Sequence, residues 1–148
     1  MMGHSPSRAH DGLSITFPVD VHVTVPGAPP VPLPAELRYD RADPYAVCLS
    51  LGRPTPFSVD WFFARSLLAE GLHRPAGIGD IVVIPQRHRH PDALRILLRP
   101  RAGVALLDVK ASAVGAFLRQ TEAMVEPGTE HRHLDIDDVV ARLTADSE

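Results

Sequence analysis

The stretch from residue 38 to residue 85 decides the fold, and it reads RYDRADPYAVCLSLGRPTPFSVDWFFARSLLAEGLHRPAGIGDIVVIP. It holds the only tryptophan, the only cysteine, both tyrosines and three of the five phenylalanines of the chain. Large aromatic side chains contribute much of the buried area of a protein core. This stretch is therefore expected to form the middle of a β-rich core.

Two strands joined as a hairpin are expected in the first half of this stretch. Apolar residues alternate with small or polar ones over residues 45–51, and Phe57, Val59, Trp61 and Phe63 alternate with Ser58 and Asp60 in the second run. A period of two is typical of a strand with one buried face, and the turn residues at 52–56 favour a hairpin between the two runs. Trp61 is expected to be largely buried, with Tyr45 and Phe57 nearby.

The second half of the stretch changes its periodicity. Leu67, Leu68 and Leu72 are at helical spacing, and Gly71 is a plausible stop, so residues 64–72 predict a short helix. Residues 81–84 are an apolar run of strand length that ends at Pro85. With two further apolar runs at 94–98 and 104–109, they predict an antiparallel meander.

The N-terminal part contains the clearest strand signal, a strict alternation of apolar and polar residues over residues 13–25. Pro18 interrupts it, so the strand is expected to lie at an edge there or to carry a bulge. Residues 26–34 are rich in proline and predict a connector, while the secondary structure of residues 33–42 remains ambiguous. Residues 1–12 show no periodicity and are expected to be a disordered tail.

The C-terminal third is expected to be helical. One face of a first helix comprises Val114, Phe117, Leu118, Thr121 and Val125, and Pro127-Gly128 ends it. Asp135 or Asp137 can cap a final helix, whose apolar face comprises Ile136, Val139, Val140 and Leu143. Strands followed by helices indicate an α+β fold, with antiparallel β-meanders, one short inserted helix and two C-terminal helices. Residues 13–148 are expected to form a single domain.

Composition narrows the function classes. The net charge is −3 with neutral histidines, which argues against a general nucleic-acid or membrane-surface binder. The single cysteine, Cys48, excludes an intrachain disulfide and is interpreted as a small buried strand residue. The N-terminus has no long apolar run, so no signal peptide is expected and a cytoplasmic location is favoured.

No catalytic, cofactor or metal site is predicted. Gly71, Gly77 and Gly79 lack the order and the preceding strand of a dinucleotide loop. His131 and His133 would point the same way on an extended segment, but zinc needs three or four ligands and no clear partner set exists. A metal enzyme at these two histidines is kept as a minor hypothesis, and the chain is expected not to be an enzyme.

The strongest charge feature is a group of basic residues in and around the predicted meander. It is interpreted as a candidate partner surface made by Arg87, Arg89, Arg95, Arg99 and Arg101. Proteins that bind single-stranded nucleic acids interleave such residues with aromatic side chains, and this segment has none.

Six sequence blocks, taken together and in order, resemble the SsgA-like family of sporulation-specific cell-division proteins of filamentous actinobacteria. The blocks are LRYD (37–40), DPYAV (43–47), WFFAR (61–65), LLAEGLHRP (67–75), GIGD (77–80) and PGTEHRH (127–133). The resemblance extends from about residue 13 to the C-terminus, and within the family it is strongest to the SsgB type.

This resemblance implies a fold and a function that the residues alone do not give. It implies a non-enzymatic adaptor that recruits the tubulin-like protein FtsZ to future septum sites and promotes its polymerisation, helped by an SsgA-type paralogue. It also implies a Whirly-like fold, a homotrimer, no cofactor and a location at the division septum. The alternative is single-stranded nucleic-acid binding by a Whirly-like fold, motivated by the arginines of residues 87–101.

Overall fold

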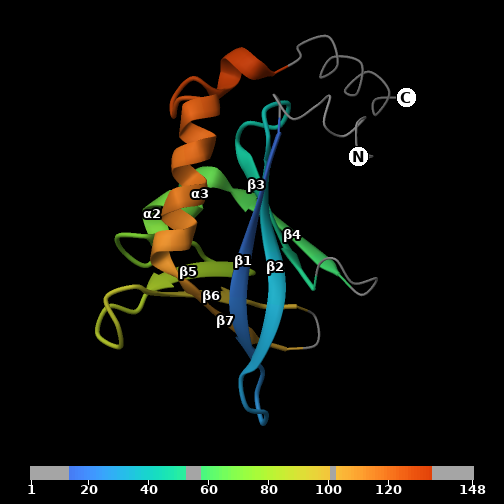
Figure 1. Cartoon of the computed structure of the whole chain (residues 1–148), viewed down its shortest axis with the longest axis vertical. Helices are drawn as coiled ribbons and strands as arrows, with labels where there is room; N and C mark the ends of the chain where they lie inside the picture. The colour runs from blue at the N-terminus through green and yellow to red at the C-terminus, as the bar shows by residue number, and fades with distance from the viewer. Residues whose placement is uncertain (1–13, 53–57, 101–102, 135–148) are drawn as a thin grey trace.

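The computed structural model describes residues 14–52, 58–100 and 103–134, which form a seven-stranded sheet accompanied by helices (Figure 1). The elements are β1 (Ser14–Thr24), β2 (Val31–Asp40), β3 (Ala46–Leu51), β4 (Val59–Ala64), α2 (Arg65–Gly71), β5 (Ile81–Pro85), β6 (Ala93–Leu98), β7 (Ala105–Lys110), α3 (Ala111–Met124) and η2 (Glu130–His133). Their order across the sheet is β4-β3-β2-β1-β7-β6-β5, and all neighbours are antiparallel. The predicted α+β class with an antiparallel sheet is confirmed.

Strand β2 corrects the predicted connector, because the strand begins at Val31 and not after residue 34. Pro32 and Pro34 lie in its first half, opposite His22 and Asp20 of β1. Strand β3 pairs only with residues 35–38 of β2, and beyond it Gly52 donates its N–H to the carbonyl oxygen of Pro34 at 2.8 Å, so no residue of β3 requires an N–H group from either proline. A proline lacks the N–H group that a second neighbour would require, and it is tolerated at such a position.

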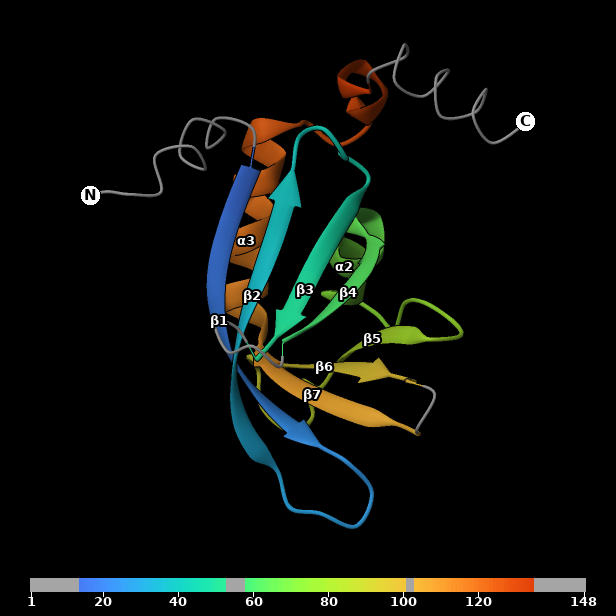
Figure 2. The ribbon, with the colours of Figure 1, turned by 90° about the vertical axis from the view of Figure 1, so that its right-hand side faces the viewer.

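Strand β1 joins the two halves of the sheet. It pairs with β2 over ten positions but with β7 only from His22 to Thr24. Pro18 therefore lies where β1 has one neighbour, which confirms the expectation of a local edge. Strands β5, β6 and β7 form the predicted meander, and they run across the direction of β1–β4 (Figure 2). The sheet consequently curls.

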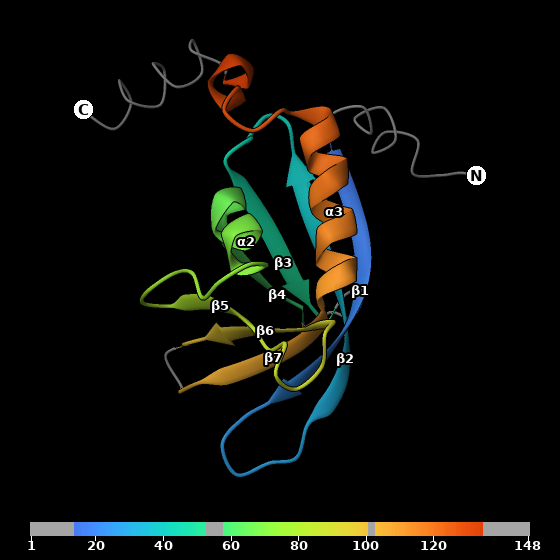
Figure 3. The ribbon, with the colours of Figure 1, turned by 90° about the vertical axis from the view of Figure 1, so that its left-hand side faces the viewer.

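Both α-helices lie on the same side of the curled sheet (Figure 3). Helix α3 buries Val114, Phe117 and Leu118, as its periodicity predicts. The ring of Phe117 meets Phe17 of β1 edge to face, with 6.1 Å between ring centroids. Helix α2 buries Leu68 beside it. Among the described helices, none has both the length and the apolar character needed to cross a bilayer.

The aromatic centre of the core differs from the prediction. Trp61 packs against the core from β4 but is partly and not fully buried, and Tyr45, expected near it from the sequence, is 50% exposed. Strand β4 lies at the edge of the sheet, where a side chain has neighbours on one side only. Tyr39 on the more central β2 is the fully buried aromatic here, and Phe57 lies outside the described residues.

Helix α3 ends shortly before the predicted break at Pro127-Gly128, and the extended conformation assumed for His131 and His133 is not formed. The helix ends at Met124, because Val125 is already extended, and Gly128 follows with a φ of 92°, in the left-handed region. Residues 130–133 then form the short 3-10 helix η2, so the two histidines do not alternate along a strand. The tail at 1–12 and the final helix expected at residues 136–143 lie outside the described residues.

Candidate functional site

The arginines predicted to form a partner surface are distributed over the β5–β7 half of the sheet. Arg87 and Arg89 lie in the exposed loop between β5 and β6. The Arg87 guanidinium donates to the carbonyl oxygen of Leu72 at 2.7 Å, so this loop is attached to the end of α2. Arg89 is exposed beside it, and its backbone N–H donates to Gln86.

Arg95 and Arg99 lie on or just after β6, and Arg101 is outside the described residues. Arg95 is opposite Asp108 of β7, and its guanidinium donates to both carboxylate oxygens at 2.9 and 3.2 Å. This carboxylate raises the pKa of Arg95 further. Arg99 is exposed, about 13 Å along the strand from Arg95 at 3.3 Å per residue. The structure therefore leaves Arg89 and Arg99 as the more available charges of the set.

The exposed aromatic side chains lie away from these arginines. Among the described residues, the aromatics with at least half of their surface exposed are Tyr45, just before β3, and Phe62 of β4. Phe62 lies on β4 and the arginines lie in or beside β5–β7, so the exposed aromatics and the arginines are on different strands of the sheet. The interleaving of aromatic and basic side chains that single-strand binding requires is not formed by these residues.

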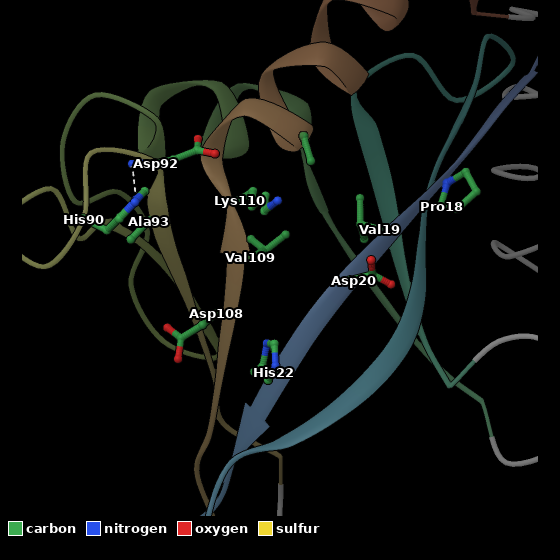
Figure 4. Close-up of a pocket in the computed structure, with 11 residues that line it drawn as sticks. Pro18, Val19, Asp20, His22, His90, Asp92, Ala93, Asp108, Val109 and Lys110 are labelled. Carbon is green, nitrogen blue, oxygen red and sulfur yellow. Dashed lines mark hydrogen bonds between the residues drawn. The ribbon is translucent and has the colours of Figure 1, made fainter.

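A hollow with a volume of about 610 Å³ is formed where β1, β7 and the start of α3 meet (Figure 4). Its charged side chains are mixed, with Asp20, Asp92 and Asp108 beside His22 and Lys110. Its lining includes no serine, threonine or cysteine, the residues that most often serve as hydroxyl or thiol nucleophiles. Across residues 14–52, 58–100 and 103–134, no three His, Cys, Asp or Glu side chains gather as a metal site.

Asp92, at the rim of this hollow, fixes the start of α3. Its carboxylate accepts hydrogen bonds from the backbone N–H and the hydroxyl of Ser112 at 2.7 and 2.8 Å. These hydrogen bonds favour the ionised carboxylate and lower the pKa of Asp92. The group therefore acts as a cap for the first turn of the helix, a structural role that leaves it less free to bind a ligand.

A buried arginine that the sequence analysis misses connects the helices to the segment after α3. Arg65 is only 3% exposed, and its guanidinium lies 5.0 Å from the centre of the Tyr39 ring. It donates to the carbonyl oxygens of Thr121 and Val125 at 3.1 and 2.8 Å, and to Glu130 at 2.7 Å. One side chain thus holds the C-terminal end of α3 and the start of η2.

The positive charge of Arg65 is stabilised by the groups around it, which together with Arg65 are called the Arg65 centre: Tyr39, Thr121, Val125 and Glu130. The last carbonyl groups of a helix carry partial negative charge, which favours a cation at that position. Tyr39 donates its hydroxyl to the carbonyl oxygen of Pro44 at 2.8 Å, and burial raises the pKa of Tyr39 to about 12.

The local sequence signal for Arg65 is weak. A cation in the first turn of α2 is unfavourable for that helix, which indicates that the cation has a partner elsewhere.

The ion pair of Glu130 with Arg65 predicts that the folded protein loses stability in acid. The hydrogen bond from Arg65 lowers the pKa of Glu130 below its ordinary value of about 4.3 in an unfolded chain. Its stabilising contribution is therefore complete above that value and is lost as the pH falls through the lowered pKa of the folded state. Urea unfolding measured between pH 6 and pH 3 should show a steeper acid loss in the parent than in Glu130→Gln, and equal slopes would contradict the ion pair.

Cys48 lies in a polar row on the sheet face opposite the helices. It is buried and free, as predicted, and Arg38 donates to its sulfur at 3.4 Å. The same Arg38 side chain pairs with Asp60 of β4 at 3.1 Å, and Ser50 donates to Asp60 at 2.7 Å. Strands β2, β3 and β4 are thus linked on this face, and the charge of Asp60 is compensated within the chain.

Comparison with known proteins identifies relatives along most of the chain. The family described as "Streptomyces sporulation and cell division protein, SsgA" matches residues 33–130. The sporulation-specific cell division protein SsgB of Streptomyces coelicolor is 43% identical over 90% of this chain and 98% of its own length. The SsgB of Kineococcus radiotolerans is 39% identical over 95% of this chain and 86% of its own.

Two solved structures have the same fold. One, described by the correlation between SsgB mutations and longitudinal cell division during sporulation of Streptomyces coelicolor, has a TM-score of 0.74 and 45% identity over 82% of this chain and 95% of its own. The other, an SsgA-like sporulation-specific cell division protein from Thermobifida fusca, has a TM-score of 0.77 and 34% identity, over 87% and 94% of the two chains. Sequence and structure agree, and the chain belongs to the SsgA family of sporulation and cell division proteins.

Proposed function

We propose that this chain is a non-enzymatic adaptor that recruits FtsZ to division sites and promotes its assembly during sporulation-specific septation. The observation that carries the proposal is the 43% identity to a sporulation-specific cell division protein over nearly the full length of both chains. In this proposal the protein acts in the cytoplasm at the septum as a homotrimer, together with an SsgA-type paralogue. No cofactor takes part.

The proposed contact with FtsZ includes the more available arginines of the β5–β7 half. Arg89 and Arg99 are exposed, whereas Arg95 is neutralised by Asp108 and Arg87 is attached to the end of α2. Exposed charges contribute to the rate and specificity of association, and each contributes about 0.5–1 kcal/mol to affinity. This supports a charged, peripheral contact with a polymer surface.

Co-sedimentation with FtsZ polymers tests the proposal. The parent should pellet with the polymers and increase the polymerised fraction, and the double variant Arg89→Ala/Arg99→Ala should bind roughly five- to thirtyfold more weakly, for a loss of about 1–2 kcal/mol. Arg119→Ala, an exposed arginine on α3, is the matched control and should bind as the parent does.

Two outcomes would count against this proposal in different ways. A parent that neither pellets with FtsZ nor changes its polymerisation would contradict the adaptor function. Tight, salt-sensitive binding of single-stranded oligonucleotides in its place would favour the alternative of nucleic-acid binding, because phosphate contacts release counterions. Equal losses in the double variant and in Arg119→Ala would contradict only the arginine contact.

A further inference from the structure

The β5 edge of the sheet is covered by another segment of the chain, whereas the β4 edge has no described strand beyond it. At the β5 edge, Val83 exchanges both backbone hydrogen bonds with Ala76, at 2.9 and 2.8 Å, and Pro85 has no N–H to offer. At the β4 edge, no described strand lies beyond β4 (Figures 1 and 2). Proteins normally protect such edges with Lys, Pro, a bulge or a covering segment. The six residues of β4 contain neither Lys nor Pro.

The register identifies which backbone groups of β4 are available for pairing. Arg65 donates its backbone N–H to Tyr45 at 2.7 Å, so odd-numbered residues of β4 bond to β3. The backbone groups of Asp60 and Phe62, and the N–H of Ala64, consequently point away from β3. The Ala64 carbonyl belongs to the start of α2, where the N-cap carbonyl accepts the first helical hydrogen bond. An occupant of this edge must therefore be an extended strand.

The side chains of β4 define the chemistry of that strand. Phe62 is 64% exposed on one face of the sheet, and Val59 is 53% exposed on the other. The one charge of β4, Asp60, is already compensated by Arg38 and hydrogen-bonded by Ser50. A strand that adds here must carry apolar side chains on both faces and little net charge. Strand β4 itself has this composition.

We propose that β4 pairs with β4 of a second copy of this chain, antiparallel and about a two-fold axis at Phe62. In this register Phe62 lies opposite its own counterpart, and Asp60 lies opposite Ala64 of the partner copy. Like charges are not opposed, and the exposed aromatic rings cover each other. The contact uses the same strand of both copies, as a two-fold interface requires, so it joins copies in pairs.

Solution mass measured by light scattering tests the pairing separately from the proposed trimer. The parent should contain two chains, or six if the contact joins two trimers, and Phe62→Lys should halve the mass by opposing two cations on the axis. Ile78→Lys, at an apolar residue that is 93% exposed elsewhere, should leave the mass unchanged. A parent of three chains that Phe62→Lys leaves intact overturns the pairing and keeps the trimer, and a parent of one chain contradicts both.

Disulfide capture tests the register without relying on a destabilised interface. Directly opposed residues of a hydrogen-bonded antiparallel pair have Cα atoms about 5.5 Å apart, within the range a disulfide accepts. In a Cys48→Ala background, Phe62→Cys should therefore form a covalently linked pair under mild oxidation, seen on a non-reducing gel. Ile78→Cys in the same background should stay unlinked. Linkage of Phe62→Cys no faster than that of Ile78→Cys overturns the proposed register.

Discussion

Arg65→Met is expected to lower the free energy of unfolding by about 3–5 kcal/mol, the usual cost of removing one partner from a buried ion pair. The substitution leaves Glu130 and the carbonyls of Thr121 and Val125 without their donor, in a region that excludes most water. It also uncovers the face of the Tyr39 ring. Urea unfolding followed by circular dichroism, with linear extrapolation to water, measures the change.

A matched control separates the buried pair from the general loss of a positive charge. Arg74 pairs with Glu70 one helical turn away at 2.9 Å, and both side chains are largely exposed to solvent. Arg74→Met should therefore cost well under 1 kcal/mol. Arg65→Lys should fall between the two, because an ammonium group cannot reproduce the forked guanidinium contacts to three acceptors. If Arg65→Met and Arg74→Met were equally stable, the assigned role of Arg65 would be wrong.

The strands with regular alternation were predictable from the sequence, and the one that contains prolines was not. Alternation of apolar and polar residues predicts β1 and the β3–β4 hairpin, because each has one face on the core. The first half of strand β2 was not predicted, because it contains Pro32 and Pro34. These prolines are tolerated in the strand because no residue of β3 pairs with them. Where β3 ends beside β2 depends on how the sheet assembles, so it cannot be predicted from the local sequence.

The candidate functional residues differ in the same way: clusters along the chain were predictable, and contacts made by the fold were not. A cluster of basic residues is visible in the sequence, but the ion pair of Arg95 with Asp108 depends on the β6–β7 register. The Arg65 centre brings together residues more than 50 positions apart in the chain, so no local motif predicts it. Likewise, the alternation predicted for this strand does not identify Phe62 as an exposed aromatic at a sheet edge, because the position of β4 in the sheet is set by the fold.

Phe117 should stabilise the core more than Trp61 does, because β4 lies at the edge of the sheet. Phe117→Ala should destabilise the protein by about 3–5 kcal/mol, the range for deleting a fully buried aromatic side chain. Phe117 is 0% exposed, and its ring packs against Phe17 between α3 and β1, so its removal leaves a cavity that helix and sheet cannot easily close.

Trp61→Ala should cost only about 1–2 kcal/mol although tryptophan is larger, because Trp61 is partly exposed on an edge strand, where neighbouring side chains and water can fill the space that it leaves. Urea unfolding of the two variants under identical conditions compares them directly. A Trp61→Ala variant less stable than Phe117→Ala would contradict this ranking. Such a result would mean that Trp61 is more buried in solution than in a single copy of the chain. The proposed pairing of two β4 strands would bury it in this way, because it covers the edge of the sheet next to Trp61.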